Sequence, residues 1–348
     1  MGADRMGKRV NFEQALALYD EDLFTLGERA DAIRRKLHGD KVFYNLNRHI
    51  NPTNVCADHC RFCGFSVHRK NPNPYTMTPE DAGRIAAEAA ARGAKELHVV
   101  SAHNKEVGLA WYFDLFKAVK KAAPNAHLKA MTAAEVEFLA RTYSLSFDAV
   151  LERMIEAGVD SMPGGGAEIF DEAVREYLCH GKVKTSDWLK IHELWHGKGR
   201  KSNATMLFGH IETRAHRIDH LLRLRALQEK TGGFNAFIPL LYQKENNFLK
   251  VETFPDAEEI LKTIAIGRIV LDNVPHIKAY WVTLSLNLAL VAQEFGADDM
   301  DGTIEKESIN SAAGAKSAKG VDQQTMIDLI QNAGFIPVER DSLYNEVK

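Results

Sequence analysis

The spacing of apolar residues along the chain switches repeatedly between a helical period and short β-type runs. Residues 11–38 place Phe12, Leu16 and Tyr19 at helical spacing, which predicts an N-terminal layer of helices. Beyond residue 40, β-type runs alternate with amphipathic stretches. The predicted strands cover residues 41–50, 96–101, 127–132, 160–162, 203–210, 235–241, 276–282 and 299–303. The predicted helices cover residues 78–92, 111–122, 134–157, 167–178, 186–196, 213–230 and 257–270.

Alternation of strand and helix is typical of a parallel sheet that closes into a barrel. About eight strands are expected, so we predict an α/β fold of the (βα)8 TIM-like type. The predicted domains are a helical extension over residues 1–40, the barrel over residues 41–315, and a helical segment over residues 316–348 that packs on the barrel. Chemistry in such barrels sits at the carboxyl ends of the strands, so the loops that follow them are the candidates for a site.

Three of the four cysteines lie within eight residues, at Cys56, Cys60 and Cys63, whereas Cys179 is far away in the sequence. This C-x3-C-x2-C spacing indicates a metal centre. Structural zinc usually takes four protein ligands, whereas a 4Fe–4S cluster can be held by three thiolates with one iron left open. The spacing therefore favours an iron–sulfur cluster.

Two alternatives stay open at this point. A zinc ion could be completed by His59 or His68. The cysteines could instead pack as small apolar groups, but the neighbouring Asp58 and Arg61 do not suit a core segment.

Charge and hydropathy narrow the classes of partner. The 44 basic and 47 acidic residues among 348 give a net charge of 44 − 47 = −3, so bulk charge implies no nucleic-acid partner. No apolar run approaches the roughly 20 residues that span a bilayer, and the start has no signal-like segment. We therefore expect a cytoplasmic protein without membrane insertion, and clustered thiols agree with a reducing compartment.

The loop CADHCRFC resembles the C-x3-C-x-(aromatic)-C loop of the radical S-adenosylmethionine (SAM) superfamily. Longer segments are similar to its menaquinone and deazaflavin branch. They read NPTNVCADHCRFCGF, SMPGGGAEIFDEAVR, SNATMLFGHIE, TGGFNAFIPL and DNVPHIKAYW. The resemblance implies that Cys56, Cys60 and Cys63 ligate a 4Fe–4S cluster, that SAM chelates the open iron, and that its cleavage gives a 5′-deoxyadenosyl radical.

Within the branch, TGGFNAFIPL and HIKAYW are most similar to the aminofutalosine synthases. This implies 3-[(1-carboxyvinyl)oxy]benzoate as the small-molecule substrate and a one-electron reductant such as flavodoxin or ferredoxin. The branch also contains cyclic dehypoxanthinyl-futalosine synthase and the deazaflavin-precursor synthase, which remain alternatives. An electron-transfer or sensing iron–sulfur protein and a zinc hydrolase are alternatives from other classes.

The resemblance also suggests which residues contact SAM, namely Ser101, Gly164, Gly165, Asn203 and Glu212. The glycines would expose backbone N–H groups at a helix N-terminus, where an anion is favoured, although a tight turn explains them equally well. The Glu212 carboxylate would accept hydrogen bonds from the ribose hydroxyls of SAM, or it would cap the following helix. Relatives commonly have Gly-Gly-x-His-Pro where this chain has Ser101 and the four residues after it, so Ser101 or backbone groups must rebuild the hydrogen bonds of that turn.

Three further residues are candidates for catalysis: His210, Arg48 and Lys278. His210 follows a predicted strand. Arg48 and Lys278 would pair with substrate carboxylates, because cations suit that task in a cavity that excludes water. Both are equally compatible with a position on the surface.

Overall fold

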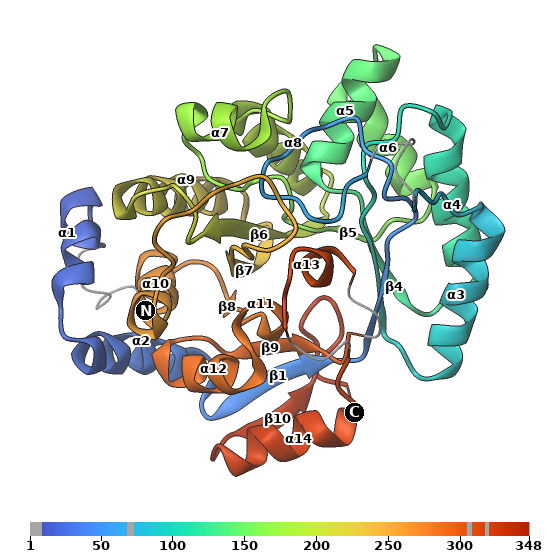
Figure 1. Ribbon diagram of the computed structural model, residues 1–348. Coiled ribbons are helices and arrows are strands. Elements are labelled where there is room, and N and C mark those ends of the chain that lie inside the picture. Colours follow the sequence, from blue (N-terminus) through green and yellow to red (C-terminus); the bar gives the residue numbers. More distant parts are fainter. Residues whose placement is uncertain (1–8, 68–72, 305–307, 317–319, 348) are drawn as a thin grey trace.

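In the computed structural model, which describes residues 9–67, 73–304, 308–316 and 320–347, a curled parallel sheet lies inside a layer of helices (Figure 1). Seven strands pair in the order β2-β3-β4-β5-β6-β7-β8, and a second sheet has the order β10-β1-β9. The strands are β1 Lys41–Asn45, β2 Asn47–Ile50, β3 Glu96–Val99, β4 His127–Ala130, β5 Ser161–Met162, β6 Lys201–Phe208, β7 Phe234–Leu241, β8 His276–Ile277, β9 Asp299–Gly302 and β10 Ile336–Glu339.

The two sheets join to form a ring. β1 runs into β2 across Leu46, and a parallel bridge between Lys278 and Asp299 links the end of β8 to β9. β9 in turn pairs in parallel with β1. Counting β1 and β2 as one interrupted strand, the ring has eight positions, and the predicted α/β fold is confirmed.

The ring is surrounded by helices, most of which cover its outside, whereas the short helix Ile309–Ala312 lines the cavity inside it. The helices are α1 Phe12–Ala17, α2 Leu23–His38, α3 Pro79–Ala91, α4 Leu109–Ala122, α5 Ala133–Tyr143, α6 Phe147–Glu156, α7 Glu172–Cys179, α8 Thr185–Gly197, α9 Arg214–Thr231, α10 Ala257–Val270, α11 Trp281–Leu284, α12 Leu286–Val291, α13 Ile309–Ala312 and α14 Gln323–Asn332. Their starts follow local rules. Thr78, for example, caps α3 through a capping box with Asp81, and Pro79 occupies the first turn. The N-terminal helices predicted from the sequence are present, and α2 lies against α10.

The predicted strand over residues 276–282 and the predicted C-terminal helical segment differ from the structure. The strand expected over residues 276–282 ends after Ile277, and Trp281–Leu284 is helical. The buried Trp281 donates its indole N–H to the Gly302 carbonyl at 2.9 Å, which holds the turned chain against β9. The segment over residues 316–348 was expected to be helical but also contains β10, which pairs with the free edge of β1.

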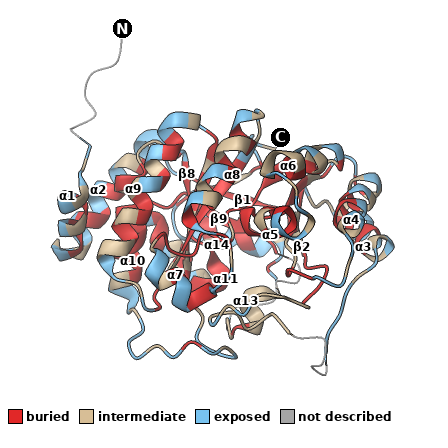
Figure 2. Ribbon diagram, turned by 90° about the horizontal axis from the view of Figure 1, so that it is seen from above, coloured by how far each residue is buried: buried red, intermediate tan, exposed pale blue. Residues whose placement is uncertain are grey.

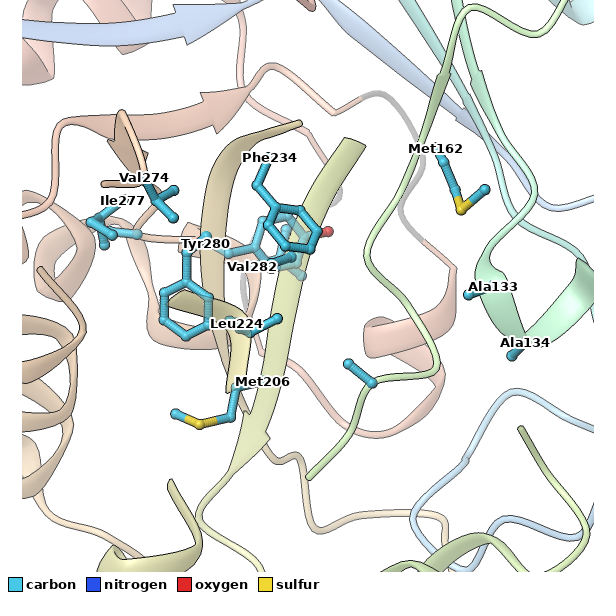
Figure 3. Close-up of a cluster of buried hydrophobic side chains, with 14 of the residues drawn as sticks. Ala133, Ala134, Met162, Met206, Leu224, Phe234, Val274, Ile277, Tyr280 and Val282 are labelled. Carbon is cyan, nitrogen blue, oxygen red and sulfur yellow. The ribbon is translucent and has the colours of Figure 1, made fainter. Parts of the chain in front are cut away.

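The apolar core lies between the ring and the helices (Figure 2). Figure 3 shows Met162, Met206, Phe234 and Ile277, which come from four successive strands, together with Leu224 from α9. These side chains are all almost fully buried, as expected for a parallel sheet that is covered by helices.

Buried ion pairs run through the ring beneath the mouth. Lys129 donates to Glu96 at 2.6 Å, and Lys278 donates to Asp301 at 2.9 Å. Arg340, which directly follows β10, reaches Asp299 at 2.5 Å, and both side chains are fully buried. The three cations are matched by three carboxylates, so their charges are largely neutralised within the ring.

We predict that Arg340→Ala lowers the free energy of unfolding by about 3 to 5 kcal/mol, because it leaves Asp299 buried without its closest cation. Arg223→Ala, which removes an exposed pair with Asp219, should change it by less than about 0.5 kcal/mol. Urea unfolding of both variants measures the difference.

Burial alone would raise the pKa of Asp299, but the charges of Arg340 and Lys278 outweigh it and lower that pKa. A carboxyl with a lowered pKa stabilises the fold above its unfolded pKa and loses that contribution as the pH falls. The gap in stability between the parent protein and Arg340→Ala should therefore shrink on acidification. An equal loss for the Arg340 and Arg223 variants would contradict this account.

Candidate active site at the mouth of the barrel

The ring encloses a cavity of about 290 Å³ that is lined mainly by the carboxyl halves of its strands and by the residues just beyond them. Because parallel strands all point the same way, their ends deliver polar side chains to this one place. Seven of these positions, from β2 onward around the ring, are His49, His98, Thr132, Asn203, Ile238, Tyr280 and Asp301.

Cys56, Cys60 and Cys63 line the same cavity. Their loop is fixed by backbone hydrogen bonds, among them Cys63 N–H to the Cys60 carbonyl at 3.1 Å and Cys56 N–H to the Val67 carbonyl at 3.2 Å. Cys179 is buried but is not among the described residues that line the cavity. Three thiols that share one cavity fit a 4Fe–4S cluster with an open position.

The zinc alternative gains no support from the geometry. His59 is exposed and is absent from the described residues of the cavity wall, and His68 lies outside the described residues. The described part of the chain offers no second cysteine pair that would complete a tetrahedral site with the loop.

Burial controls the protonation of the thiols in this loop. Burial raises the pKa of Cys60 well above its usual range and raises the pKa of Cys56. Burial therefore favours the neutral thiols, and iron coordination would reverse that preference. Lys182 also lowers the cost of a thiolate at Cys60. Its ammonium bonds Glu168 at 2.7 Å and lies 5.6 Å from the centre of the Phe62 ring.

Four of the predicted SAM contacts come together at the cavity: Ser101, Gly164, Gly165 and Asn203. A Cβ on Gly164 would lie 2.8 Å from the Asn203 carbonyl oxygen, so β5 and β6 approach as closely as they do only with glycine there. The Asn203 side chain faces the cavity, and the described residues offer it no hydrogen bond. The Ser101 N–H donates to Glu135 at 3.0 Å, which anchors the turn that differs from the usual glycine pair.

The expected helix N-terminus at the glycines is not present. The helix predicted over residues 167–178 begins only at Glu172, with Asp171 as its N-cap. The turn is instead a close strand contact, because the Thr205 hydroxyl donates to the Gly164 carbonyl at 2.6 Å. An anion bound there would meet individual backbone N–H groups without the help of a helix dipole.

Glu212 does not line the cavity. Its side chain is fully buried and accepts hydrogen bonds from Gly209 N–H at 2.7 Å, from His210 N–H at 2.9 Å and from the Arg217 guanidinium at 2.7 Å. Thr213 supplies the N-cap of α9, so Glu212 is not a helix cap either. In this structure Glu212 fixes the turn after β6, and its predicted contact with SAM would require that turn to rearrange.

His210 is part of the same buried turn. Its Nε2 lies 3.0 Å from the Leu207 carbonyl and its Nδ1 accepts the Ile211 N–H at 2.7 Å. Both ring nitrogens are thus engaged with the backbone, and the residue is absent from the described wall of the cavity. Its predicted catalytic role does not fit this position.

The two candidate cations also lie elsewhere. Register pairs His49 with His98, and both imidazoles line the cavity, so strand alternation turns Arg48 to the opposite face of β2. Lys278 is buried and bonded to Asp301, as described above, and is not among the described residues of the wall. Neither residue is placed to hold a substrate carboxylate.

Sequence reasoning missed a pair of imidazoles inside the ring. The His49 and His98 rings lie 4.6 Å apart. Burial lowers the pKa of His98 well below its usual range, so the ring is neutral, and its Nε2 has no hydrogen-bond partner within the described residues. The period of two in the β2 and β3 segments was the available signal, because it places both residues on the inner face.

The family models place the chain in a class of enzyme. Residues 50–224 match the model described as the radical SAM superfamily, and residues 231–348 match the CofH/MqnC C-terminal region. The chain therefore belongs to the radical SAM superfamily, whose members use a 4Fe–4S cluster and SAM. This confirms the predicted class and cofactors, and it removes the basis for a zinc hydrolase or a purely electron-transferring protein.

Individual relatives show which branch of the superfamily this chain is most similar to. The chain is 40% identical over 347 residues to aminodeoxyfutalosine synthase of Thermus thermophilus, covering 98% of this chain and 93% of the relative. It is 38% identical over 346 residues to cyclic dehypoxanthine futalosine synthase of Streptomyces coelicolor, covering 98% and 86%. The crystal structure of methylornithine synthase (PylB) shares the fold, with a TM-score of 0.76, 15% identity and 95% coverage of each chain.

These relatives confirm the predicted resemblance and a transferase-type radical SAM enzyme. In the described part of the chain, we find no helix that combines the length and apolar character required to cross a membrane.

We predict that Cys56→Ala, Cys60→Ala and Cys63→Ala each abolish the cluster in anaerobically reconstituted protein, whereas Cys179→Ala retains it. The reason is that the first three thiols share the cavity and the fourth does not. Iron and sulfide content with the visible spectrum measure the outcome. A full cluster in Cys60→Ala would refute the assignment.

A second pair of variants separates the turn from the cavity wall. Asn203→Ala should weaken SAM binding about fivefold, the equivalent of one hydrogen bond worth about 1 kcal/mol. Glu212→Ala should instead cost about 3 kcal/mol of stability, because Arg217 loses a buried partner, while the folded fraction binds SAM normally. Equilibrium dialysis and urea unfolding distinguish the two, and a specific loss of SAM affinity in Glu212→Ala would restore the original assignment.

Proposed function

We propose that the chain is an aminodeoxyfutalosine synthase of menaquinone biosynthesis by the futalosine route. It adds the 5′-deoxyadenosyl radical to the enol-ether double bond of 3-[(1-carboxyvinyl)oxy]benzoate. Migration of the aryl group from oxygen to carbon and loss of the carboxylate then give 6-amino-6-deoxyfutalosine, with methionine as the other product. The observation that carries the proposal is the similarity to aminodeoxyfutalosine synthase along nearly the whole length of both chains.

The described residues of the cavity wall suggest which side chains hold the cluster and which orient SAM. Cys56, Cys60 and Cys63 would hold the cluster, which when bound supplies the electron that cleaves the sulfonium of SAM. Asn203 and the backbone at Gly164 and Gly165 would orient SAM beside them. A one-electron donor such as flavodoxin or ferredoxin would reduce the cluster.

Carboxylate binding needs a new assignment, because Arg48 and Lys278 do not face the cavity. Lys182 is the one Lys or Arg side chain among the described residues of the wall, and it lies close to Cys60. We assign it to a carboxylate bound next to the cluster, which would share the ammonium with Glu168. Deeper in the ring, the neutral imidazole of His98 would provide a hydrogen bond to the second substrate without placing a further charge there.

The reaction asks the protein mainly for orientation and for protection of the radical. Val100, Ile238 and Leu240 form apolar parts of the wall, which limit water around the reacting carbons. An enclosed cavity also keeps the vinyl carbon close to the 5′ carbon of the adenosyl group, and such positioning lowers the entropic part of the barrier.

A second candidate is cyclic dehypoxanthine futalosine synthase, because the identity to that relative is only slightly lower. That enzyme class uses the adenosyl radical to abstract hydrogen and releases free 5′-deoxyadenosine. A deazaflavin-precursor synthase remains a third candidate from the same branch. The fate of the adenosyl group separates the first candidate from the second.

We predict that SAM labelled in its adenosine part transfers the label to an adduct with the benzoate substrate, with methionine formed in equal amount. Reduced protein, SAM and 3-[(1-carboxyvinyl)oxy]benzoate are incubated without oxygen, and products are separated by chromatography with mass detection. Protein carrying Cys60→Ala serves as the control without a cluster. Label found only as free 5′-deoxyadenosine, with dehypoxanthine futalosine consumed in a parallel incubation, would identify the cyclase instead.

A further inference from the structure

Three distant segments of the chain meet on the outer side of the cysteine loop. The Arg61 N–H donates to the Leu178 carbonyl at the end of α7, at 2.8 Å, and the Phe248 N–H donates to the Arg61 carbonyl, also at 2.8 Å. Arg61, Tyr177 and Phe248 thus share one location, which we call the Arg61 patch. The backbone bonds fix its position relative to the loop.

The side chains of the Arg61 patch are presented to solvent. Phe248 is 84% exposed and Tyr177 is 48% exposed, values that place both among the most exposed large apolar residues of the described chain. The Arg61 guanidinium lies 4.3 Å from the centre of the Tyr177 ring, and among the described residues no carboxylate pairs with it. Single exposed apolar residues are ordinary, but arginine, tyrosine and phenylalanine together have the composition of a protein interface.

The position of the patch matters because of what lies on the other side of the loop. The three thiols face the cavity, where SAM and the second substrate would be enclosed. A protein donor cannot enter a cavity of about 290 Å³, so it must approach from outside. Arg61 is next to Cys60 and two residues from Cys63, so its Cα lies within about 8 Å of both of their Cα atoms.

We propose that the Arg61 patch is the docking site of the one-electron donor, and that this donor is a small acidic redox protein. The inference rests on the proposed function insofar as the three cysteines must hold the cluster. The patch carries an unpaired cation, so an acidic partner complements it, and the two aromatic rings supply contact area. One electron passes from the donor to the cluster, so the donor is oxidised and the cluster is reduced without any bond being made or broken.

The test measures the rate of cluster reduction by a reduced flavodoxin, followed by the visible spectrum under anaerobic conditions. Arg61→Glu and Phe248→Asp should each lower the second-order rate constant at least tenfold, since steering by complementary charge commonly contributes that much. Reduction by dithionite, a small chemical reductant, should be unchanged. The flavodoxin rate of the parent protein should also fall with added salt, and that of Arg61→Glu should not.

Matched controls lie on other faces. Lys121→Glu reverses an exposed cation on α4, and Phe24→Asp replaces a phenylalanine on α2 that is 71% exposed. In both control variants, flavodoxin and dithionite should each reduce the cluster at the parent rate. Iron content is measured first. If Arg61→Glu loses its cluster, the proposal is tested with Phe248→Asp alone, because the exposed Phe248 ring contributes little to folding.

Equal flavodoxin rates for the patch variants and the controls would overturn the proposal. It would also be overturned if sedimentation showed that Phe248→Asp dissociates a dimer of this chain, because the patch would then be a self-association surface. The readout does not depend on the product. A protein that reduces as expected but releases only 5′-deoxyadenosine would therefore refute the proposed function and leave the docking site intact.

Discussion

Parallel pairing around the ring is the constraint on which the rest of this structure depends. Because the strands from β2 to β9 run in one direction, their carboxyl ends meet at a single mouth, and the cysteine loop leaves β2 at that mouth. Closure requires β9 to lie between β8 and β1. The backbone β-bridge between Lys278 and Asp299 joins β9 to the end of β8, and parallel pairing joins β9 to β1. Without closure, the imidazoles of β2 and β3 and the residues of β6 would not face one cavity.

Ring closure buries ion pairs on β9, and these pairs also determine which charges can reach the site. Lys278 and Arg340 are cations in a region that excludes water, and each is held by a carboxylate of β9. Both cations are therefore paired with carboxylates of β9 and are not available to bind a substrate. Apart from Asp58, Asp301 and the pair of Lys182 with Glu168, the described side chains of the cavity wall are neutral. A neutral interior suits chemistry in which a carbon radical, and not a proton, is transferred.

The cysteine loop separates two environments. Its thiols face the cavity, and on its other side Arg61 stacks on Tyr177 next to the exposed Phe248. The separation follows from local geometry, because backbone hydrogen bonds tie the loop to the end of α7 and to the segment after β7. With the proposed function and docking site, one short loop would hold the cluster on its inner side and receive electrons on its outer side.

The sequence by itself determined the class of fold and the grouping of three thiols in one loop, because both depend on local information. Periodicity marks each strand and helix, and C-x3-C-x2-C places three thiols within one loop whatever surrounds it. Ser101, Gly164, Gly165 and Asn203, which the resemblance suggested as SAM contacts, do line the cavity, and their contact with SAM stays a prediction.

Tertiary structure alone decided the direction and the partners of individual side chains. Arg48 faces away because register fixes its neighbour His49 on the inner face, and Lys278, Glu212 and His210 are occupied by groups distant in space or by the backbone of a buried turn. Lys182 reaches the cavity through the packing of the segment after α7, for which the linear sequence carries no signal. A charged residue type predicts what a side chain is able to bind, but which partner it binds depends on the neighbours that the closed ring places beside it.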